Sequence, residues 1–219
     1  MKKLESSLKN MLLSLTGFAV VAGVLLGLVN GVTADPIAQA KAAALGNAIA
    51  VVVPGFDNNP AEASDTVEVN GASYIIYKAT KGGQPVGVAV QSSANGFGGA
   101  LTVLVGFDNE GNIIDYSLLG HTETPGLGSK ADVWFKKGGK GDIIGKNPGE
   151  KPLTVSKDGG DIDAITASTI TSRAFLLAVN NAYAAYKGQQ VDGASGASQQ
   201  ASPAEAPAAA EENENVGKE

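Results

Sequence analysis

The sequence predicts an α+β protein in which an N-terminal transmembrane helix is followed by an antiparallel β-meander packed with helices. Three observations lead to this class. Residues 11–32 form an uncharged apolar run, residues 73–119 contain strand-like runs joined by short turns, and residues 171–186 carry apolar side chains at helical spacing. Short turns make neighbouring strands antiparallel, so the strands are expected to form a meander.

The first element is an apolar helix over Met11–Val32. A helix of 22 uncharged residues spans about 33 Å, which is enough for a bilayer core of about 30 Å. The preceding segment carries three lysines against one glutamate, and this bias keeps the N-terminus in the cytoplasm and the rest of the chain on the periplasmic side of the inner membrane. The alternative is a signal peptide cleaved after Val32-Thr33-Ala34. We favour a retained single-pass anchor within residues 1–34, because the apolar run exceeds the core of a usual signal peptide.

The extracytoplasmic domain is expected to cover residues 35–187. An alanine-rich helix over Pro36–Val53 comes first, and Pro54-Gly55 ends it. Turn signals then join strand-like runs in pairs, at Lys81–Gln84 and at Asp108–Gly111. The expected strands are Ser73–Thr80, Pro85–Ser92, Leu101–Phe107 and Asn112–Leu119. The expected covering helices are a short one around Lys130–Lys136 and a longer one from about Thr171 to Tyr186, with Phe175, Leu176, Val179, Ala182, Tyr183 and Tyr186 on its buried face.

The composition changes sharply after Tyr186. Residues 188–219 are mostly Gly, Ser, Gln, Ala, Pro and Glu. Such a segment cannot bury enough apolar surface to offset its loss of conformational entropy, so we expect a disordered acidic tail.

Charge and composition exclude several classes of function. A formal net charge of -6 without a basic stripe argues against a nucleic-acid partner. The chain has no cysteine and a single histidine, which excludes disulfides, cysteine-ligated clusters and a multi-histidine metal centre within one protomer. Redox chemistry would therefore have to come from an organic cofactor or from a partner.

Hydroxyl side chains crowd the start of the last predicted helix. They occur at residues 166, 168, 169, 171 and 172, shortly after Asp163. At a helix N-terminus, unpaired N–H groups and the helix dipole favour a phosphate. The plainer interpretation is that these hydroxyls are N-caps. A capping box is absent, since no Glu or Gln follows three residues after Thr166, Ser168 or Thr169.

Two glycine-bearing loops flank predicted strands. Asn95–Leu101 precedes a strand, and Gly120–Gly128 follows one. Each alone is more typical of a turn than of a site. The second loop places hydrogen-bonding side chains at 121–124 directly before Pro-Gly-Leu-Gly, where the backbone can closely approach a flat ligand.

The run from Asp163 to Thr169 resembles the Asp-x-x-(Ser/Thr)-Gly-Ala-Thr flavinylation motif of the FMN-binding domain family. In that family a flavin transferase esterifies FMN phosphate onto the final threonine, which here is Thr169. Ala167 stands where glycine is usual, and Ser168 stands where alanine is usual.

Residues 11–187 also resemble the G subunit of Rnf-type electron transport complexes. That family has a Gly-Tyr-Gly-Gly loop, here Gly96-Phe97-Gly98-Gly99, and a His-x-Glu-Thr-Pro-Gly-Leu-Gly loop, here His121–Gly128. The C subunit of sodium-translocating NADH:quinone reductase is a relative, but it more often has Gly-Leu-Trp after the first loop, whereas this chain has Gly98-Gly99-Ala100.

The resemblance implies an electron-carrying component with covalent FMN, rather than a stand-alone enzyme, in a complex that couples electron flow between ferredoxin and NAD to ion movement. It implies other membrane subunits as partners and a flavin transferase for maturation. Thr169 would hold the phosphate, with Asp163, Thr166, Ala167 and Ser168 around it; the ring would lie against His121, Thr122, Glu123, Thr124, Gly126, Leu127, Gly128, Gly96, Gly98 and Gly99. The alternatives are a component of the sodium-translocating NADH:quinone reductase type, a non-redox anchored binding module and a flavin enzyme with its own substrate.

Overall fold

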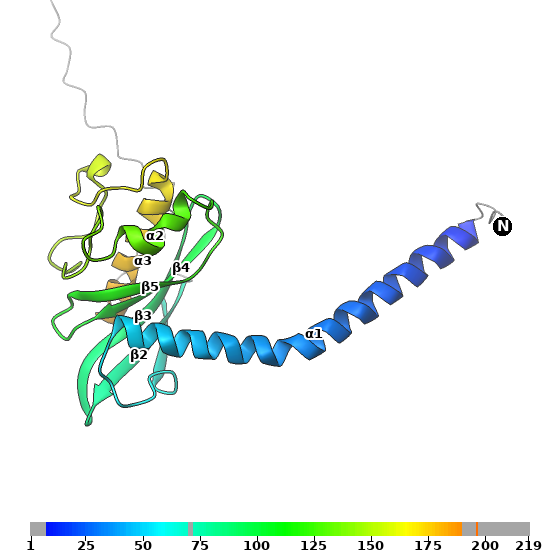
Figure 1. The fold of residues 1–219 in the computed structure, drawn as a ribbon, viewed down its shortest axis with the longest axis horizontal. Coiled ribbons are helices and arrows are strands. Elements are labelled where there is room, and N and C mark those ends of the chain that lie inside the picture. The colour runs from blue at the N-terminus through cyan, green and yellow to red at the C-terminus, as the bar shows by residue number, and fades with distance from the viewer. Residues whose placement is uncertain (1–7, 70–71, 190–195, 197–219) are drawn as a thin grey trace, which may run out of the picture. The chain divides into compact units, whose positions relative to one another are not determined.

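The computed structural model describes residues 8–69, 72–189 and 196. The chain divides into two compact units, Met1–Ala48 and Ile49–Glu219. The second unit holds a five-stranded sheet and all the helices after α1 (Figure 1). The predicted α+β class is therefore confirmed.

Helix α1 covers Leu8–Val52 without a break at Pro36. The predicted apolar run and the alanine-rich segment after it are thus one helix of 45 residues. A proline inside a helix removes one backbone hydrogen bond, but the apolar and helix-favouring residues on both sides continue the helix here. As predicted, the helix ends before Pro54-Gly55, where Gly55 adopts a φ of 91°. In the described part of the chain, α1 is the one helix that is long and apolar enough to cross a membrane.

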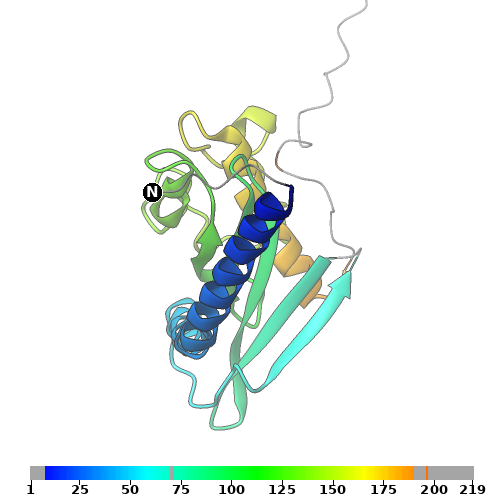
Figure 2. The same cartoon turned by 90° about the vertical axis from the view of Figure 1, so that its right-hand side faces the viewer.

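The sheet has the strand order β1-β2-β3-β4-β5, and every neighbouring pair is antiparallel. Its strands are β1 (Ser64–Val69), β2 (Ala72–Lys81), β3 (Gln84–Asn95), β4 (Ala100–Phe107) and β5 (Ile113–His121). The four predicted strands are β2 to β5. β1 was not predicted, because its side chains alternate only weakly between apolar and polar and none of them is buried. It pairs with β2 at the edge of the sheet (Figure 2).

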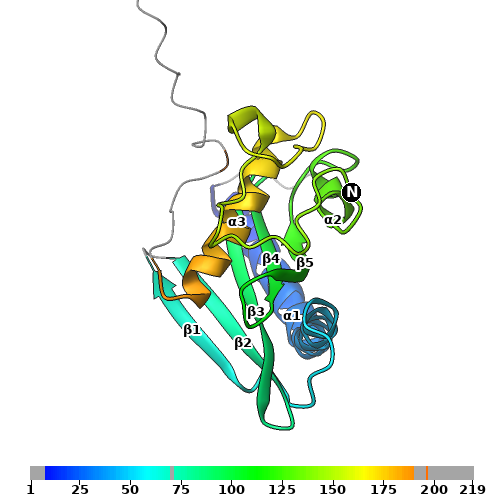
Figure 3. The same ribbon diagram turned by 90° about the vertical axis from the view of Figure 1, so that its left-hand side faces the viewer.

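Helix α3 (Thr169–Tyr186) packs on one face of the sheet, mainly over β3 and β4 (Figure 3). Phe175 anchors this layer, because its ring stacks on Phe135 with the centroids 4.3 Å apart and meets Tyr116 edge-on at 4.8 Å. The predicted short helix is present as a 3-10 turn, η1 (Gly128–Lys130), that leads into α2 (Ala131–Trp134). A second 3-10 turn, η2 (Ser156–Asp158), lies in the connection to α3.

The last turn of α1 covers the opposite face of β4. A Cβ atom at Gly106 would collide with the Val52 carbonyl, and Val53 packs beside Gly87 of β3. β4 is therefore covered on both faces and is buried along most of its length. Packing on both faces fixes the central strands, and the two glycine-bearing loops leave the ends of the sheet strands.

Most of the predicted tail lies outside the described residues. The one tail residue that is described beyond Gln189 is Gly196, and it is buried. Its N–H donates to the Asn95 carbonyl at 3.1 Å, and its Cα lies against Ile170 and Ala174 of α3. The disorder of the remaining tail stays a prediction.

Candidate functional site

Three segments that are distant in the sequence meet around one pocket of about 400 Å³. They are the loop after β3, the loop after β5 and the start of α3. The strand register explains part of this meeting, because Asn95 pairs with Ala100 and Leu101 pairs with His121, so both loops leave the same end of the sheet. The pocket is lined by Phe97, Glu123, Thr124, Leu127, Ala167, Ser168, Thr169 and Ile170.

Six of these lining residues were predicted as site residues, and they come from two of the three predicted segments. Phe97 was quoted within the first loop, and Ile170 was not singled out. The other predicted residues do not line the pocket: Gly96, Gly98, Gly99, His121, Thr122, Gly126, Gly128, Asp163 and Thr166.

Glu123 ties the three segments together. Its carboxylate is buried, with 5% of the residue exposed. Oε1 accepts hydrogen bonds from the backbone N–H of Phe97 at 2.9 Å and of Gly98 at 3.3 Å. Oε2 accepts the hydroxyl hydrogen of Thr171 at 2.8 Å. A buried carboxylate with three donors fixes the relative positions of both loops and the first turn of α3.

The glycines of the two loops allow them to pack this closely. A Cβ atom on Gly96 or Gly98 would collide with Glu123 or with the Thr122 carbonyl, and one on Gly128 would lie 2.6 Å from Glu123 Oε2. The sequence interpretation gave these glycines a role in approaching a flat ligand. In the structure Gly96 and Gly98 lie against the 121–128 loop, and Gly128 lies against Glu123 of its own loop and Thr171 of α3. The role toward a flat ligand stays a prediction.

His121 and Thr122 do not line the pocket, but their side chains support the loop through hydrogen bonds. The Glu123 N–H donates to His121 Nδ1 at 3.3 Å, and Thr122 Oγ1 donates to the Gly98 carbonyl at 2.9 Å. Both contacts hold backbone atoms of the two glycine loops in place.

Two hydroxyl residues at the start of α3 line the pocket, Ser168 and Thr169. Ser168 is the N-cap residue, but its side chain forms no capping hydrogen bond. Ser172 instead closes the first turn, because its hydroxyl donates to the Ser168 carbonyl at 2.9 Å and accepts the Ile165 N–H at 2.9 Å. Thr171 is committed to Glu123. Thr169 is half-buried, lines the pocket and accepts from Lys157 Nζ at 3.3 Å.

Ala167 is strained at the position where the motif usually has glycine. Its φ is 62°, and among the described residues it is the one non-glycine with a positive φ. The left-handed conformation costs a residue with a Cβ about 1–2 kcal/mol.

We therefore expect Ala167→Gly to raise the free energy of unfolding by about 0.5–1 kcal/mol, because part of the relieved strain is offset by the greater entropy of glycine in the unfolded chain. Chemical denaturation of the detergent-solubilised protein measures this change. The matched control is Ala184→Gly within α3, which should lower stability by about 1 kcal/mol. Destabilisation by both substitutions would contradict the strain at Ala167.

Asp163 does not reach the pocket. Its Oδ1 accepts from the Ser156 hydroxyl at 3.4 Å, and its carbonyl accepts from Trp134 Nε1 at 2.8 Å. Thr166 is exposed and does not line the pocket. Asp163 therefore contacts the η2 turn and α2.

Sequence reasoning placed Phe97 and Leu127 in the two glycine loops, but it missed the contact of Lys157 with Thr169. Phe97 and Leu127 are large apolar side chains that are 71% and 39% exposed, and both line the pocket. Lys157 reaches Thr169 from the η2 turn. Twelve residues separate Lys157 from Thr169 in a connection without periodicity, so no sequence signal places them together.

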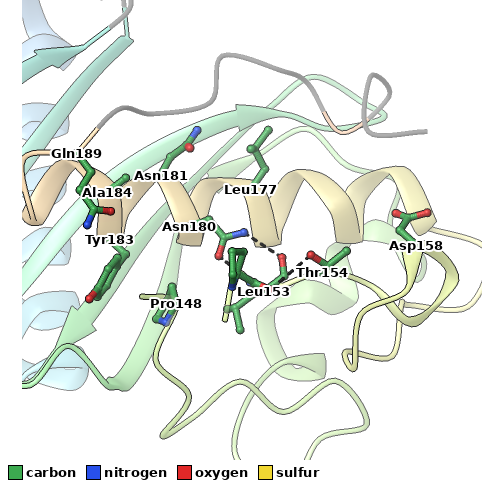
Figure 4. Close-up of a pocket in the computed structure, with 11 residues that line it drawn as sticks. Pro148, Leu153, Thr154, Asp158, Leu177, Asn180, Asn181, Tyr183, Ala184 and Gln189 are labelled. Atoms are coloured by element: carbon green, nitrogen blue, oxygen red, sulfur yellow. Dashed lines mark hydrogen bonds between the residues drawn. The ribbon is translucent and has the colours of Figure 1, made fainter. Parts of the chain in front are cut away.

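A second pocket of about 400 Å³ lies between the 148–154 loop and the later turns of α3 (Figure 4). Asn180 holds this loop on the helix, since its amide accepts from the Leu153 N–H and donates to the Leu153 carbonyl, both at 2.9 Å. None of the predicted site residues lines this pocket.

The first pocket has features that suit a flavin nucleotide. Phe97, Leu127 and Ile170 offer apolar walls for a ring, and the start of an 18-residue helix lies beside a lysine, where a phosphate is favoured. No group of three metal-ligating side chains occurs within the described ranges.

Comparisons with known proteins show the family that this chain resembles. Residues 96–184 match the FMN-binding domain family. Over 181 residues the chain is 37% identical to the G subunit of the ion-translocating oxidoreductase complex of Yersinia pestis, covering 78% of this chain and 86% of that protein. It is 34% identical over 196 residues to the G subunit of the same complex from Aliivibrio fischeri, covering 84% and 93%.

A solved structure is also similar. It is the C subunit of the Na(+)-translocating NADH-quinone reductase from Parabacteroides distasonis, with 27% sequence identity, a TM-score of 0.37, and coverage of 52% of this chain and 61% of that chain.

Proposed function

Because this chain belongs to the family of the G subunit of Rnf-type ion-translocating oxidoreductase complexes, we propose that it is a membrane-anchored electron carrier that holds FMN covalently on Thr169. It acts within a complex that couples electron flow between ferredoxin and NAD to ion movement. The other membrane subunits are its partners, and a flavin transferase matures it.

One observation supports this proposal above the others. The pocket joins the two glycine loops to the start of α3, where Ser168 and Thr169 line it while Thr171 and Ser172 are committed to internal hydrogen bonds. Of the two lining hydroxyl residues, Ser168 is buried, whereas Thr169 is half-buried and accepts from Lys157. If the hydroxyls at the start of α3 served only as helix caps, the Ser168 hydroxyl would be expected to form a capping hydrogen bond. It forms none.

The residues around the pocket have different roles in holding the cofactor. FMN supplies the redox chemistry when it is bound. Thr169 carries the phosphate at the helix start, and Phe97, Leu127 and Ile170 exclude water from the ring. Glu123 holds both loops in place. No general acid or base is assigned, because a carrier that only passes electrons needs none from the protein.

Attachment needs an activated donor, since a phosphoester does not form spontaneously from FMN in water. With a flavin adenine dinucleotide as donor, Thr169 Oγ1 forms a bond to the phosphorus on the riboflavin side. The pyrophosphate P–O bond breaks, and AMP leaves with the hydroxyl proton. The chain gains the mass of one FMN less one water, and nothing is oxidised or reduced.

The test of this function is flavin fluorescence that stays with the protein after denaturing electrophoresis. Fluorescence in the band of the transferase-matured chain is expected. A band without fluorescence would favour the non-redox binding module. NADH or substrate oxidation by the isolated chain would favour an independent flavin enzyme.

We expect the apolar segment of α1 to remain attached as a membrane anchor, with the domain outside the cytoplasm. Its length and composition suffice for a span, and lysines precede it. N-terminal sequencing of the protein extracted from membranes should find a start that precedes the apolar run at Met11. A mature protein that begins at Asp35 would show instead that the segment is a cleaved signal peptide.

A further inference from the structure

Two of the three residues of the η2 turn contact the proposed flavinylation motif, and the third contacts α3 just after it. Ser156 donates to Asp163, Lys157 donates to Thr169, and Asp158 pairs with Arg173 of α3. Building on the function proposed above, we propose that Lys157 is the cationic partner of the phosphate on Thr169. In this role it orients the threonine hydroxyl before attachment and pairs with the phosphodiester afterwards.

The turn is fixed to α3 by a bidentate ion pair. Arg173 donates to Asp158 through Nε at 2.7 Å and through its terminal nitrogen at 2.6 Å, and both side chains are largely buried. Asp158 raises the pKa of Arg173, so the guanidinium keeps its charge. Parallel hydrogen bonds to one carboxylate set both distance and angle, so the neighbouring residue, Lys157, is held over the first turn of the helix.

Backbone hydrogen bonds fix the same turn to the segment that precedes Thr169. The Ser156 N–H donates to the Ile162 carbonyl at 2.8 Å, and the Ile162 N–H donates to the Thr154 carbonyl at 3.2 Å. Val155 and Ile162 form a parallel bridge, and both are buried. Lys157 therefore projects from a turn that is held both by Arg173 of α3 and by the segment around Ile162.

The charges around Thr169 leave the Lys157 ammonium available for an anion. Within residues 8–69, 72–189 and 196, the ion pairs do not include Lys157. Three carboxylates around this region have other partners: Asp158 pairs with Arg173, Glu123 accepts from backbone N–H groups and Thr171, and Asp163 accepts from Ser156. Nζ lies 3.3 Å from the oxygen that would bear the phosphorus. The phosphodiester oxygens, one bond further out, fall within reach of a flexible lysine side chain.

The electrostatic consequence has two parts. During transfer the developing charge on the phosphoryl oxygens is stabilised by a cation already in place. After transfer a charge-assisted hydrogen bond joins the phosphodiester to η2. Loss of the ammonium should therefore slow attachment and also weaken the stabilisation that attachment gives to the fold.

The experiment compares three variants with the wild-type full-length chain in detergent. Lys157→Met removes the charge and keeps the chain length, and Lys157→Arg keeps the charge. Lys151→Met is the matched control, since Lys151 is an exposed lysine that pairs with Asp161. Each protein is incubated with purified flavin transferase and flavin adenine dinucleotide, and the mass gain is followed over time. The melting temperature is measured before and after loading.

Lys157→Met should slow the mass gain by on the order of tenfold, the effect of about 1.4 kcal/mol. It should melt like the wild type when unloaded and gain less in melting temperature on loading. Lys157→Arg should regain most of the wild-type rate of mass gain and most of the wild-type rise in melting temperature on loading. Lys151→Met should match the wild type in both. Equal rates and equal melting gains for Lys157→Met and the wild type would overturn the role of Lys157 alone. Absence of any mass gain in the wild type would overturn the proposed function itself, and this inference with it.

Discussion

Replacing Thr169 with valine is expected to abolish covalent attachment of FMN. Valine has nearly the shape of threonine and lacks only the hydroxyl, so the pocket and the helix start should be preserved. Thr169 is half-buried, and its hydroxyl contacts Lys157 and no buried group, so the free energy of unfolding should change by less than about 0.5 kcal/mol. Intact mass after co-expression with a flavin transferase should show the gain of one FMN less one water in the wild type and none in the variant.

The neighbouring hydroxyls provide the controls for this assignment. Thr166→Val removes an exposed hydroxyl that does not line the pocket, and it should leave the mass gain unchanged. Thr171→Val removes the hydrogen bond to Glu123 and should cost about 1–3 kcal/mol of stability while the chain still accepts FMN. An adduct on Thr169→Val, or its loss in Thr171→Val without loss of folding, would show that the acceptor is another residue.

The sheet could be predicted because its strands follow local rules. β2 to β5 are apolar runs separated by turn signals, and antiparallel pairing needs no long-range information. β1 escaped prediction because its stability comes from pairing with β2 at an exposed edge and not from its own pattern. The continuity of α1 through Pro36 also could not be predicted locally, because a proline inside a helical pattern can either end the helix or only kink it.

The site was predicted as three motifs, but the connections among them were not. The sequence placed Thr169 at a helix start and glycines in both loops. It did not indicate that Glu123 would join all three segments through Phe97, Gly98 and Thr171, since that depends on a register in which two loops leave the same end of a sheet. The contact between Lys157 and Thr169 likewise depends on the path of an irregular connection.

Glu123→Ala is expected to disrupt the site as a whole. The substitution removes the acceptor of the buried Thr171 hydroxyl and of the part-buried hydrogen bonds from the Phe97 and Gly98 N–H groups. Each such group costs about 1–3 kcal/mol, and loss of the network should lower the free energy of unfolding by about 3–5 kcal/mol. Chemical denaturation of the unloaded protein measures this loss. Attachment of FMN should fall with it, because Thr169 sits two residues before the Thr171 that Glu123 holds.

Glu123→Gln separates the hydrogen bonds of this residue from its charge. The amide oxygen can still accept from Phe97 and Gly98, and the amide nitrogen can donate to Thr171 Oγ1, so folding and attachment should persist. What disappears is a negative charge at the wall of the pocket, where few polar groups screen it. The loaded Glu123→Gln protein should therefore show a shifted flavin absorption spectrum and a raised midpoint potential, because reduction adds electrons to the ring.

His121→Ala is the control, since His121 supports the same loop but does not line the pocket, and it should keep the attachment with a smaller spectral change. If Glu123→Gln matches the wild type in spectrum and potential while Glu123→Ala is destabilised, the loop from His121 to Gly128 is a structural support and the ring lies elsewhere.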